Sequence, residues 1–216
     1  MKRAMRRVAL VAVVCVACLG ASKPPAGFDW HLPSGVRPPP VPADNPMSAA
    51  KVALGRRLFY DADLSIDGTV ACATCHEQHR AFTEGNATHP GVRDARGRRN
   101  VMALANVAYF APLTWAMPSL TTLEEQVRVP VLSEHPVEMG MAGREQAIAD
   151  RLGADSCYRR MFIAAFPKEH GAITLTTVAK AIAAFERTLL SFDSPYDRYK
   201  RGERSAISDD AKRGEA

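Results

Sequence analysis

Outside its first residues, the sequence lacks an excess of charge of either sign. The 216 residues include 28 basic and 23 acidic side chains, a formal net charge of +5. Lys2, Arg3, Arg6 and Arg7 all lie within residues 1–21, which contain no acidic residue, so the remainder has 24 basic and 23 acidic residues. Nucleic-acid-binding proteins usually carry a concentrated basic surface. The composition therefore predicts that nucleic acid is not a partner.

The sequence also lacks a hydrophobic run long enough to span a bilayer. The longest run is Val8–Leu19, which follows basic residues and precedes small ones. A spanning helix needs about 20 apolar residues, whereas this pattern is typical of a secretory signal peptide. We expect residues 1–21 to be that signal peptide and the mature protein to be periplasmic. The alternatives are an uncleaved membrane anchor and a lipid anchor at Cys18.

No segment alternates between apolar and polar residues as a half-buried strand would, and there is no internal repeat. Apolar residues instead recur at helical spacing, which predicts an all-α fold. The expected helices are Met47–Tyr60, a short helix opened at Thr122, Arg144–Leu152, Cys157–Phe166, Leu175–Phe192 and a final helix after Ser208. We expect Asp44 or Asn45 to cap the first helix, with Pro46 at its first position. Pro130 is expected to end the second.

Proline is concentrated near the N-terminus and excludes helix there. Eight of the 15 prolines lie in residues 23–46, so we expect residues 22–45 to form an extended, Pro-rich segment. Phe28 and Trp30 lie in this segment, and a simple spacer would not need them. We therefore expect both rings to pack against the body of the protein.

Five cysteines are present, and two of them form the pattern Cys72-x-x-Cys75-His76. This spacing is typical of covalent haem c, in which two thiols bond the vinyl groups and the adjacent histidine binds the iron. A disulfide between the two cysteines is an alternative. A zinc site lacks a second pair of ligands, and a thioredoxin-like pair lacks a βαβ setting. A haem would also explain why residues 61–99 are irregular, because its apolar surface would replace core side chains.

Further motifs surround this pattern, and together they resemble those of the N-terminal haem domain of the bacterial di-haem cytochrome c peroxidase and MauG superfamily. The motifs are Leu54–Asp61, Leu64-Ser65, Cys72–His76, Ala81–Thr83, Arg99-Asn100, Ala105–Tyr109, Leu123–Gln126 and Pro136–Gly140. Three more segments resemble the subgroup that accompanies copper-binding, methanobactin-associated partner proteins. These segments are Phe28–Trp30, Pro42–Pro46 and Leu113–Ala116.

The resemblance implies a cytochrome c-like haem domain over residues 46–205 and assigns roles in its pocket. It implies that His76 is the proximal iron ligand and that Glu138 is the distal acid that handles the protons of H₂O₂. Gln126 would orient that carboxylate, and Pro130 would line the haem edge. The alternative for Glu138 is a solvated loop residue, since more residues separate it from Pro130 than in the common family pattern.

Three other residues have weaker assignments from the same resemblance. Trp115 matches a tryptophan between two haems, a relay for oxidising equivalents, with a core aromatic as the alternative. Asn100 matches a calcium ligand, with a turn residue as the alternative. The loop histidine that blocks the iron in many relatives is absent from its usual place. His89 lies nearby and is the alternative ligand for that iron position, and a solvent-exposed loop histidine is the expected interpretation. Cys157 is expected to be a small buried hydrophobic residue.

The family pattern places a second C-x-x-C-H domain after the last residue of this sequence. We therefore expect residues 206–216 to begin that domain and the sequence to be a truncated product. The expected function is an exported c-type haem oxidoreductase that uses H₂O₂ to oxidise a cytochrome or a tryptophan of a copper-binding partner. The alternatives are a mono-haem electron carrier, with Met139 or Met102 as a second iron ligand, and a non-functional fragment.

Overall fold

Helices and irregular loops make up the structure, a computed structural model that describes residues 28–215. The helices are α1 (Ala49–Phe59), α2 (Cys72–Cys75), α3 (Leu123–Leu132), α4 (Glu145–Ala154), α5 (Ser156–Ala165), α6 (Leu175–Glu186), α7 (Pro195–Lys200) and α8 (Asp209–Glu215). Within residues 28–215 there is no β-strand, only three isolated bridges. The all-α prediction is confirmed. None of the described helices is long and apolar enough to cross a membrane.

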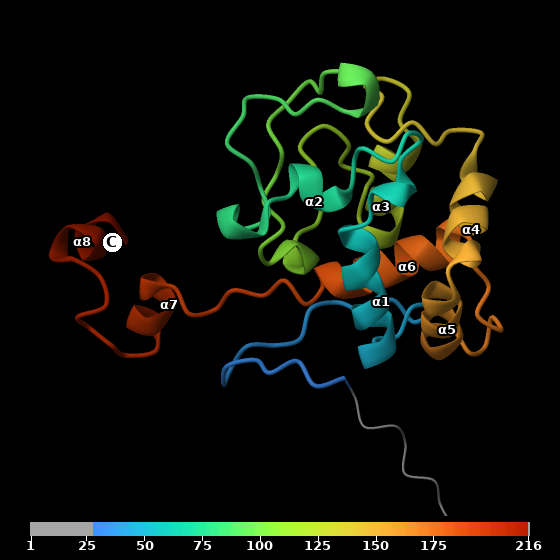
Figure 1. The fold of residues 1–216 in the computed structure, drawn as a ribbon. Helices are drawn as coiled ribbons and strands as arrows, with labels where there is room; N and C mark the ends of the chain where they lie inside the picture. The colour runs from blue at the N-terminus through green and yellow to red at the C-terminus, as the bar shows by residue number, and fades with distance from the viewer. Residues whose placement is uncertain (1–27, 216) are drawn as a thin grey trace, which may run out of the picture.

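The core forms where α1 crosses α6, with α3 and α5 packed against this pair (Figure 1). Gly55 permits the close approach, because a Cβ there would lie 1.8 Å from the carbonyl oxygen of Ala181. Leu54 and Leu58 of α1 are fully buried, as is Ile182 of α6. The apolar stripe predicted along α6 is therefore core.

The start of α1 differs from the prediction. Ser48 caps the helix, and its hydroxyl accepts a hydrogen bond from the Lys51 backbone N–H at 3.2 Å. Pro46 therefore lies before the helix. Asn45 does not cap, because its buried amide donates to Glu124 Oε1 at 2.6 Å and its oxygen accepts from Lys51 Nζ at 3.0 Å. These contacts use the side chain of Asn45, which therefore does not form the capping hydrogen bond that its position favours.

The end of α3 also differs, since Pro130 lies inside the helix rather than ending it. The loop of residues 139–141 supplies donors to the last carbonyls of α3. The Met139 N–H donates to the Pro130 oxygen, and the Met141 N–H donates to the Val131 oxygen, both at 3.0 Å. These two bonds satisfy carbonyls that a helix end leaves free, and they attach the loop to the helix.

The last long helix, α6, is shorter than predicted and ends at Glu186 rather than Phe192. Arg187 follows in a turn, and its guanidinium is drawn into the core, where it is 3% exposed. Residues 187–192 then run in irregular structure to α7 and α8, which lie to the side of the other helices (Figure 1). The short final helix predicted after Ser208 is confirmed as α8.

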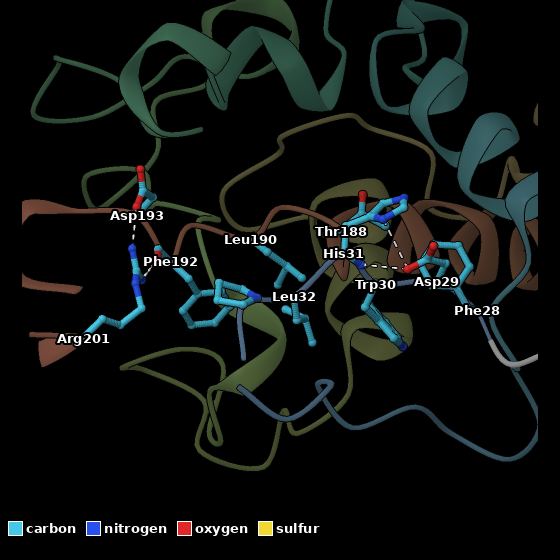
Figure 2. A pocket seen from close by; sticks show the side chains of 11 residues that line it. Phe28, Asp29, Trp30, His31, Leu32, Thr188, Leu190, Phe192, Asp193 and Arg201 are labelled. Atoms are coloured by element: carbon cyan, nitrogen blue, oxygen red, sulfur yellow. Dashed lines mark hydrogen bonds and ion pairs between the residues drawn. The ribbon is translucent and has the colours of Figure 1, made fainter. Parts of the chain in front are cut away.

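The Pro-rich segment lies along the body from residue 28 onward. Phe28 and Trp30 are half-buried and pack edge to face, with ring centroids 4.9 Å apart. They line a cavity of about 590 Å³ together with Leu190 and Phe192 (Figure 2). The Tyr109 hydroxyl donates to a backbone carbonyl of the segment, at residue 37. The prediction that both rings pack against the body is confirmed, whereas the signal peptide and Cys18 lie outside the described residues.

Candidate functional site

The single-turn helix α2 positions the C-x-x-C-H residues. Thr74 accepts a hydrogen bond from the Ala71 N–H at the helix start, and the His76 N–H donates to the Cys72 oxygen at its end, both at 2.9 Å. Residues three positions apart share one face of a helix, so both cysteines face the same side. Cys72 and Cys75 are free thiols, which does not support the disulfide alternative.

The ring of His76 is held in one orientation by the loop that follows it. Its Nδ1 lies 2.8 Å from the Phe82 carbonyl oxygen. That contact makes Nδ1 the N–H and leaves Nε2 with the free lone pair, as metal-binding histidines require. Burial lowers the pKa of His76, and hydrogen bonding of the ring to the backbone of Phe82 and Met102 partly offsets this shift. The imidazole is therefore neutral at physiological pH and ready to bind a metal.

A cavity of about 470 Å³ opens beside α2, and it continues inward as a smaller space of about 80 Å³. Cys75, His76, Gln126, Pro130 and Glu138 line both spaces, and Cys72 lines the inner one. Every residue predicted to contact the haem or handle peroxide protons therefore faces one cavity.

Glu138 reaches the cavity on the loop that is bonded to the end of α3. Its own carbonyl accepts a hydrogen bond from the Val92 N–H at 2.8 Å, which holds the loop from the other side. Gly91 must lack a side chain for this contact, because a Cβ there would lie 2.2 Å from the Val137 oxygen. Burial raises the pKa of Glu138, and His89 opposes the shift. The carboxyl group is thus a partly desolvated acid–base group rather than a solvated one.

Gln126 and Pro130 lie four residues apart on α3, so they share the helix face that lines the cavity. The next loop brings Glu138 to the same wall, because the hydrogen bond from the Met139 N–H to the Pro130 oxygen joins the loop backbone to that helix. The structure therefore places Gln126 and Glu138 on the wall of the same cavity, and the orienting role of Gln126 stays a prediction.

His89 is not the solvent-exposed loop residue that the sequence predicts. Its side chain is 17% exposed, lines the cavity and places Nδ1 2.5 Å from Glu84 Oε2. The Glu84 side chain is completely buried, and its Oε1 has no partner among the described residues. The prediction failed because the pairing with Glu84, five residues earlier, depends on how the irregular loop folds.

Trp115 is not a core aromatic, since 90% of its surface is exposed. Its neighbours Thr114 and Ala116 line the cavity whereas Trp115 does not, so this segment of the backbone lies at the cavity rim. Phe110 and Met117 are also largely exposed. These residues leave an uncovered apolar surface beside the site.

Asn100 lies at the edge of the same cavity, and its amide donates to the Asn86 carbonyl at 2.6 Å. In the described part of the chain, no group of three or more His, Cys, Asp or Glu residues is placed to hold a metal ion. The calcium assignment of Asn100 stays a prediction.

Cys157 is half-buried rather than a buried hydrophobic residue. The Arg57 guanidinium donates to its sulfur at 2.9 Å and to Asp155 Oδ2 at the same distance. The thiol lies on α5, outside the cavity. It is therefore a useful comparison for the two cysteines of α2.

Sequence reasoning missed Glu186, the last residue of α6. Its carboxyl group is buried, faces the inner cavity with Cys72 and Glu138, and leaves Oε2 without a partner. A signal was present, because Glu186 lies four residues after Ile182 on the apolar stripe of the helix. A charged residue on that stripe must either be paired or carry a function.

The residues present fit a covalent haem. The site combines two free thiols, a neutral imidazole and a largely apolar cavity wall, which is the donor set of haem c. It also places two carboxyl groups and an amide on that wall. A thioredoxin-like site is excluded for residues 28–215, because that part of the chain has no strand.

Sequence comparison matches residues 49–205 to a family described as di-haem cytochrome c peroxidase. A cytochrome-c peroxidase, IdrP1, of Denitromonas iodatirespirans is 38% identical over 99% of this chain and 55% of its own length. The methylamine utilization protein MauG of Methylophilus methylotrophus is 34% identical over 81% of this chain and 50% of its own length.

A solved structure of a MauG-like protein associated with microbial copper homeostasis superposes with a TM-score of 0.82. It is 44% identical, over 88% of this chain and 54% of that one. The chain thus spans about half the length of the curated relatives it matches.

Proposed function

The chain belongs to the di-haem cytochrome c peroxidase family, and from this premise we propose that it is the peroxide-reacting half of an exported haem oxidoreductase. The observation that supports the proposal most directly is the shared cavity, where the haem-attachment residues and a desolvated carboxyl group meet. The substrates proposed are H₂O₂ and an electron donor, either a small c-type cytochrome or a protein tryptophan.

Cys72 and Cys75 would hold the haem through thioether bonds, and His76 would bind its iron through Nε2. Burial, with a contribution from Glu138 and Glu84, raises the pKa of Cys75 to about 12. The thiols therefore stay protonated before attachment, and each thioether bond would form by net addition of S–H across a vinyl group, with sulfur bonding one carbon and hydrogen the other. When bound, the haem supplies an iron that binds peroxide and accepts oxidising equivalents.

Glu138 would act as the acid–base group for peroxide. Its carboxylate would accept a proton from one oxygen of H₂O₂ and return it to the other oxygen, which would leave as water. Gln126 would donate an amide hydrogen bond that orients this carboxylate. The elevated pKa of Glu138 suits the role, since it brings the group closer to the working pH.

Trp115 would pass oxidising equivalents out of the site. Its exposure at the cavity rim favours a role at a surface covered by another part of the enzyme or by a partner. The solved relative associated with copper homeostasis supports a copper-binding protein as a candidate partner. Periplasmic location, a lipid anchor at Cys18 and a calcium ion at Asn100 belong to the same proposal.

The experiment is to produce the chain with the cytochrome c maturation machinery and to measure its mass and spectrum. The chain and the Cys157→Ala control should gain the mass of one haem, whereas the Cys72→Ala/Cys75→Ala variant should gain none. Stoichiometric H₂O₂ should change the ferric spectrum within seconds. Absence of the added mass would refute the proposal. A low-spin spectrum indifferent to peroxide would instead identify a mono-haem electron carrier.

A further inference from the structure

Glu186 is a buried carboxyl group at the inner end of the cavity, and the proposed mechanism does not use it. It is the last residue of α6 and is 5% exposed. It shares the smaller, 80 Å³ part of the cavity with Cys72 and Glu138. Its Oε2 atom has no hydrogen-bond partner in the described residues.

The neighbouring arginine does not neutralise Glu186. The Arg187 guanidinium donates two hydrogen bonds of 2.8 Å to Glu124 and a third to the Pro40 carbonyl. Asn45 adds another donor to Glu124. Arg187 and Glu124 thus form a closed pair, and Glu186 is left as a carboxyl group without a counter-charge at bonding distance.

Other titratable groups around Glu186 are few. Cys72 and Cys75 of α2 and His76 share its cavity, Glu138 lies on the loop, and Glu124 is the ionisable group of α3 near it. Helix α1 meets the end of α6 with Gly55 and Phe59, and its Arg56 lines a different cavity, together with Phe185. None of the groups that share the inner cavity with Glu186 carries a positive charge at neutral pH.

Physical chemistry disfavours the charged form of Glu186. Burial raises its pKa to about 8, with Arg187 lowering it and Glu124 raising it. The C-terminal end of a helix carries partial negative charge, which acts in the same direction as burial. A positive charge placed in the cavity would reverse this preference.

We propose that Glu186 is a redox-linked proton acceptor, which loses its proton when the haem is ferric and regains it when the haem is ferrous. The inference rests on the proposed function, because it requires a haem bonded to Cys72 and Cys75. The ferric iron–porphyrin core carries one positive charge and the ferrous core none. In a cavity of low dielectric, that single charge decides the protonation of the unpaired carboxyl group.

The step is balanced in charge. A one-electron donor, such as a reduced c-type cytochrome, gives its electron to the iron, and the Glu186 carboxylate takes one proton from solvent to form its O–H bond. On oxidation, the electron leaves the iron and the proton leaves Glu186 for solvent. The local charge of the site stays constant, which explains why a carboxyl group is tolerated in the core here.

The test is a reductive titration of the haem-loaded 216-residue chain at several pH values, with redox mediators. The potential of the unmodified chain should fall as pH rises. In Glu186→Gln, this slope should be lost and the potential should stay at the acid limit of the unmodified chain. Glu125→Gln, which removes an exposed carboxylate of α3, should keep the slope.

A second readout separates proton uptake from a structural effect. The infrared difference spectrum between the two oxidation states should show a protonated-carboxyl band on reduction, absent in Glu186→Gln and present in Glu125→Gln. The inference would be overturned if Glu186→Gln kept both the slope and the band. The same holds if Glu138→Gln were the only variant to lose them. Absence of covalent haem would refute the proposed function instead, and the mass measurement detects that outcome separately.

Discussion

Four carboxyl groups show how position decides the chemistry of one residue type. Glu84 is paired with His89, and Glu124 with Arg187. Glu138 lies on the cavity wall, and Glu186 faces the inner cavity without a partner. The same side chain therefore serves as a structural ion-pair partner or as a group able to move a proton. Which role it takes depends on whether a partner compensates for the burial of its charge.

Glu138→Gln tests the acid–base role. The amide cannot accept the peroxide proton, so the rate of the peroxide reaction should fall by about a hundredfold. In the unmodified chain, that rate should also fall as pH drops through the raised pKa of Glu138, since the protonated form cannot act as the base. Stopped-flow spectra of the ferric protein measure both effects.

The control for this variant is Glu134→Gln, on the exposed part of the same loop. Its rate and its pH profile should match those of the unmodified chain. An unchanged rate in Glu138→Gln would remove that residue from the mechanism.

Arg187→Met tests the buried ion pair. The change leaves Glu124 charged and without its bidentate donor, so the free energy of unfolding should fall by about 3 kcal/mol. Urea denaturation measures this loss. Arg128→Met, which removes a more exposed arginine bonded to Thr176 at 3.4 Å, should change the value by less than about 1 kcal/mol.

The pair also gives a pH dependence. Burial acts to raise the pKa of Glu124, but hydrogen bonds from Arg187 and Asn45 hold this pKa below its usual 4.5. A lowered folded-state pKa contributes stability above pH 4.5, and that contribution is lost as pH falls through the lowered value. The difference between Arg187→Met and the unmodified chain should therefore shrink in acid, and a constant difference would contradict this account.

At the scale of elements, the crossing of α1 and α6 determines where the site forms. It places Phe59 against Phe185, with ring centroids 5.3 Å apart, and Phe59 is 6.3 Å from the His76 ring by the same measure. The bonds from the 139–141 loop to α3 then fix the opposite side of the cavity. Two contacts between elements therefore position the proximal and distal groups separately.

Gly55→Ala tests the crossing. The added Cβ would lie 1.8 Å from the Ala181 carbonyl, which is backbone and cannot move aside. The helices must separate, so the free energy of unfolding should fall by at least about 2 kcal/mol despite the better helix propensity of alanine.

Gly153→Ala is the matched control, because Gly153 also lies in a helix but has only one atom nearby, 3.9 Å away. Its stability should be unchanged or slightly higher. Equal stability losses in the two variants would contradict this account, because the loss would then not depend on the helix crossing.

At the scale of the whole molecule, the haem is expected to complete the core. The irregular stretch of residues 61–99 contains only one-turn helices, and it forms part of the wall of a cavity of about 470 Å³. Such a stretch has little secondary structure to stabilise it. The fold is therefore expected to depend on its cofactor as well as on its helices.

Removing the haem should lower stability. The Cys72→Ala/Cys75→Ala variant should lose about 5 kcal/mol of unfolding free energy, from roughly 200 Å² of apolar porphyrin at about 25 cal/mol per Å². Urea denaturation followed by circular dichroism measures the change, with Cys157→Ala as the control that keeps its haem. Equal stability with and without haem would show that residues 61–99 are held by the polypeptide alone.

The exposed apolar surface at the cavity rim belongs to the same scale. Trp115, Phe110 and Met117 lie uncovered beside the site, and the chain spans about half the length of its curated relatives. The function proposed for Trp115 would therefore depend on what covers this surface.

The sequence by itself determined the features that depend on neighbouring residues. Helical periodicity predicted the all-α fold and most helices, and the C-x-x-C-H pattern identified a haem-attachment motif, because these signals lie within a few residues. Only the tertiary structure decided that Ser48 caps α1, that α6 ends at Glu186 and that His89 is paired with Glu84. Each of these depends on packing or pairing within the folded chain, since a buried polar group takes whichever partner folding brings to it.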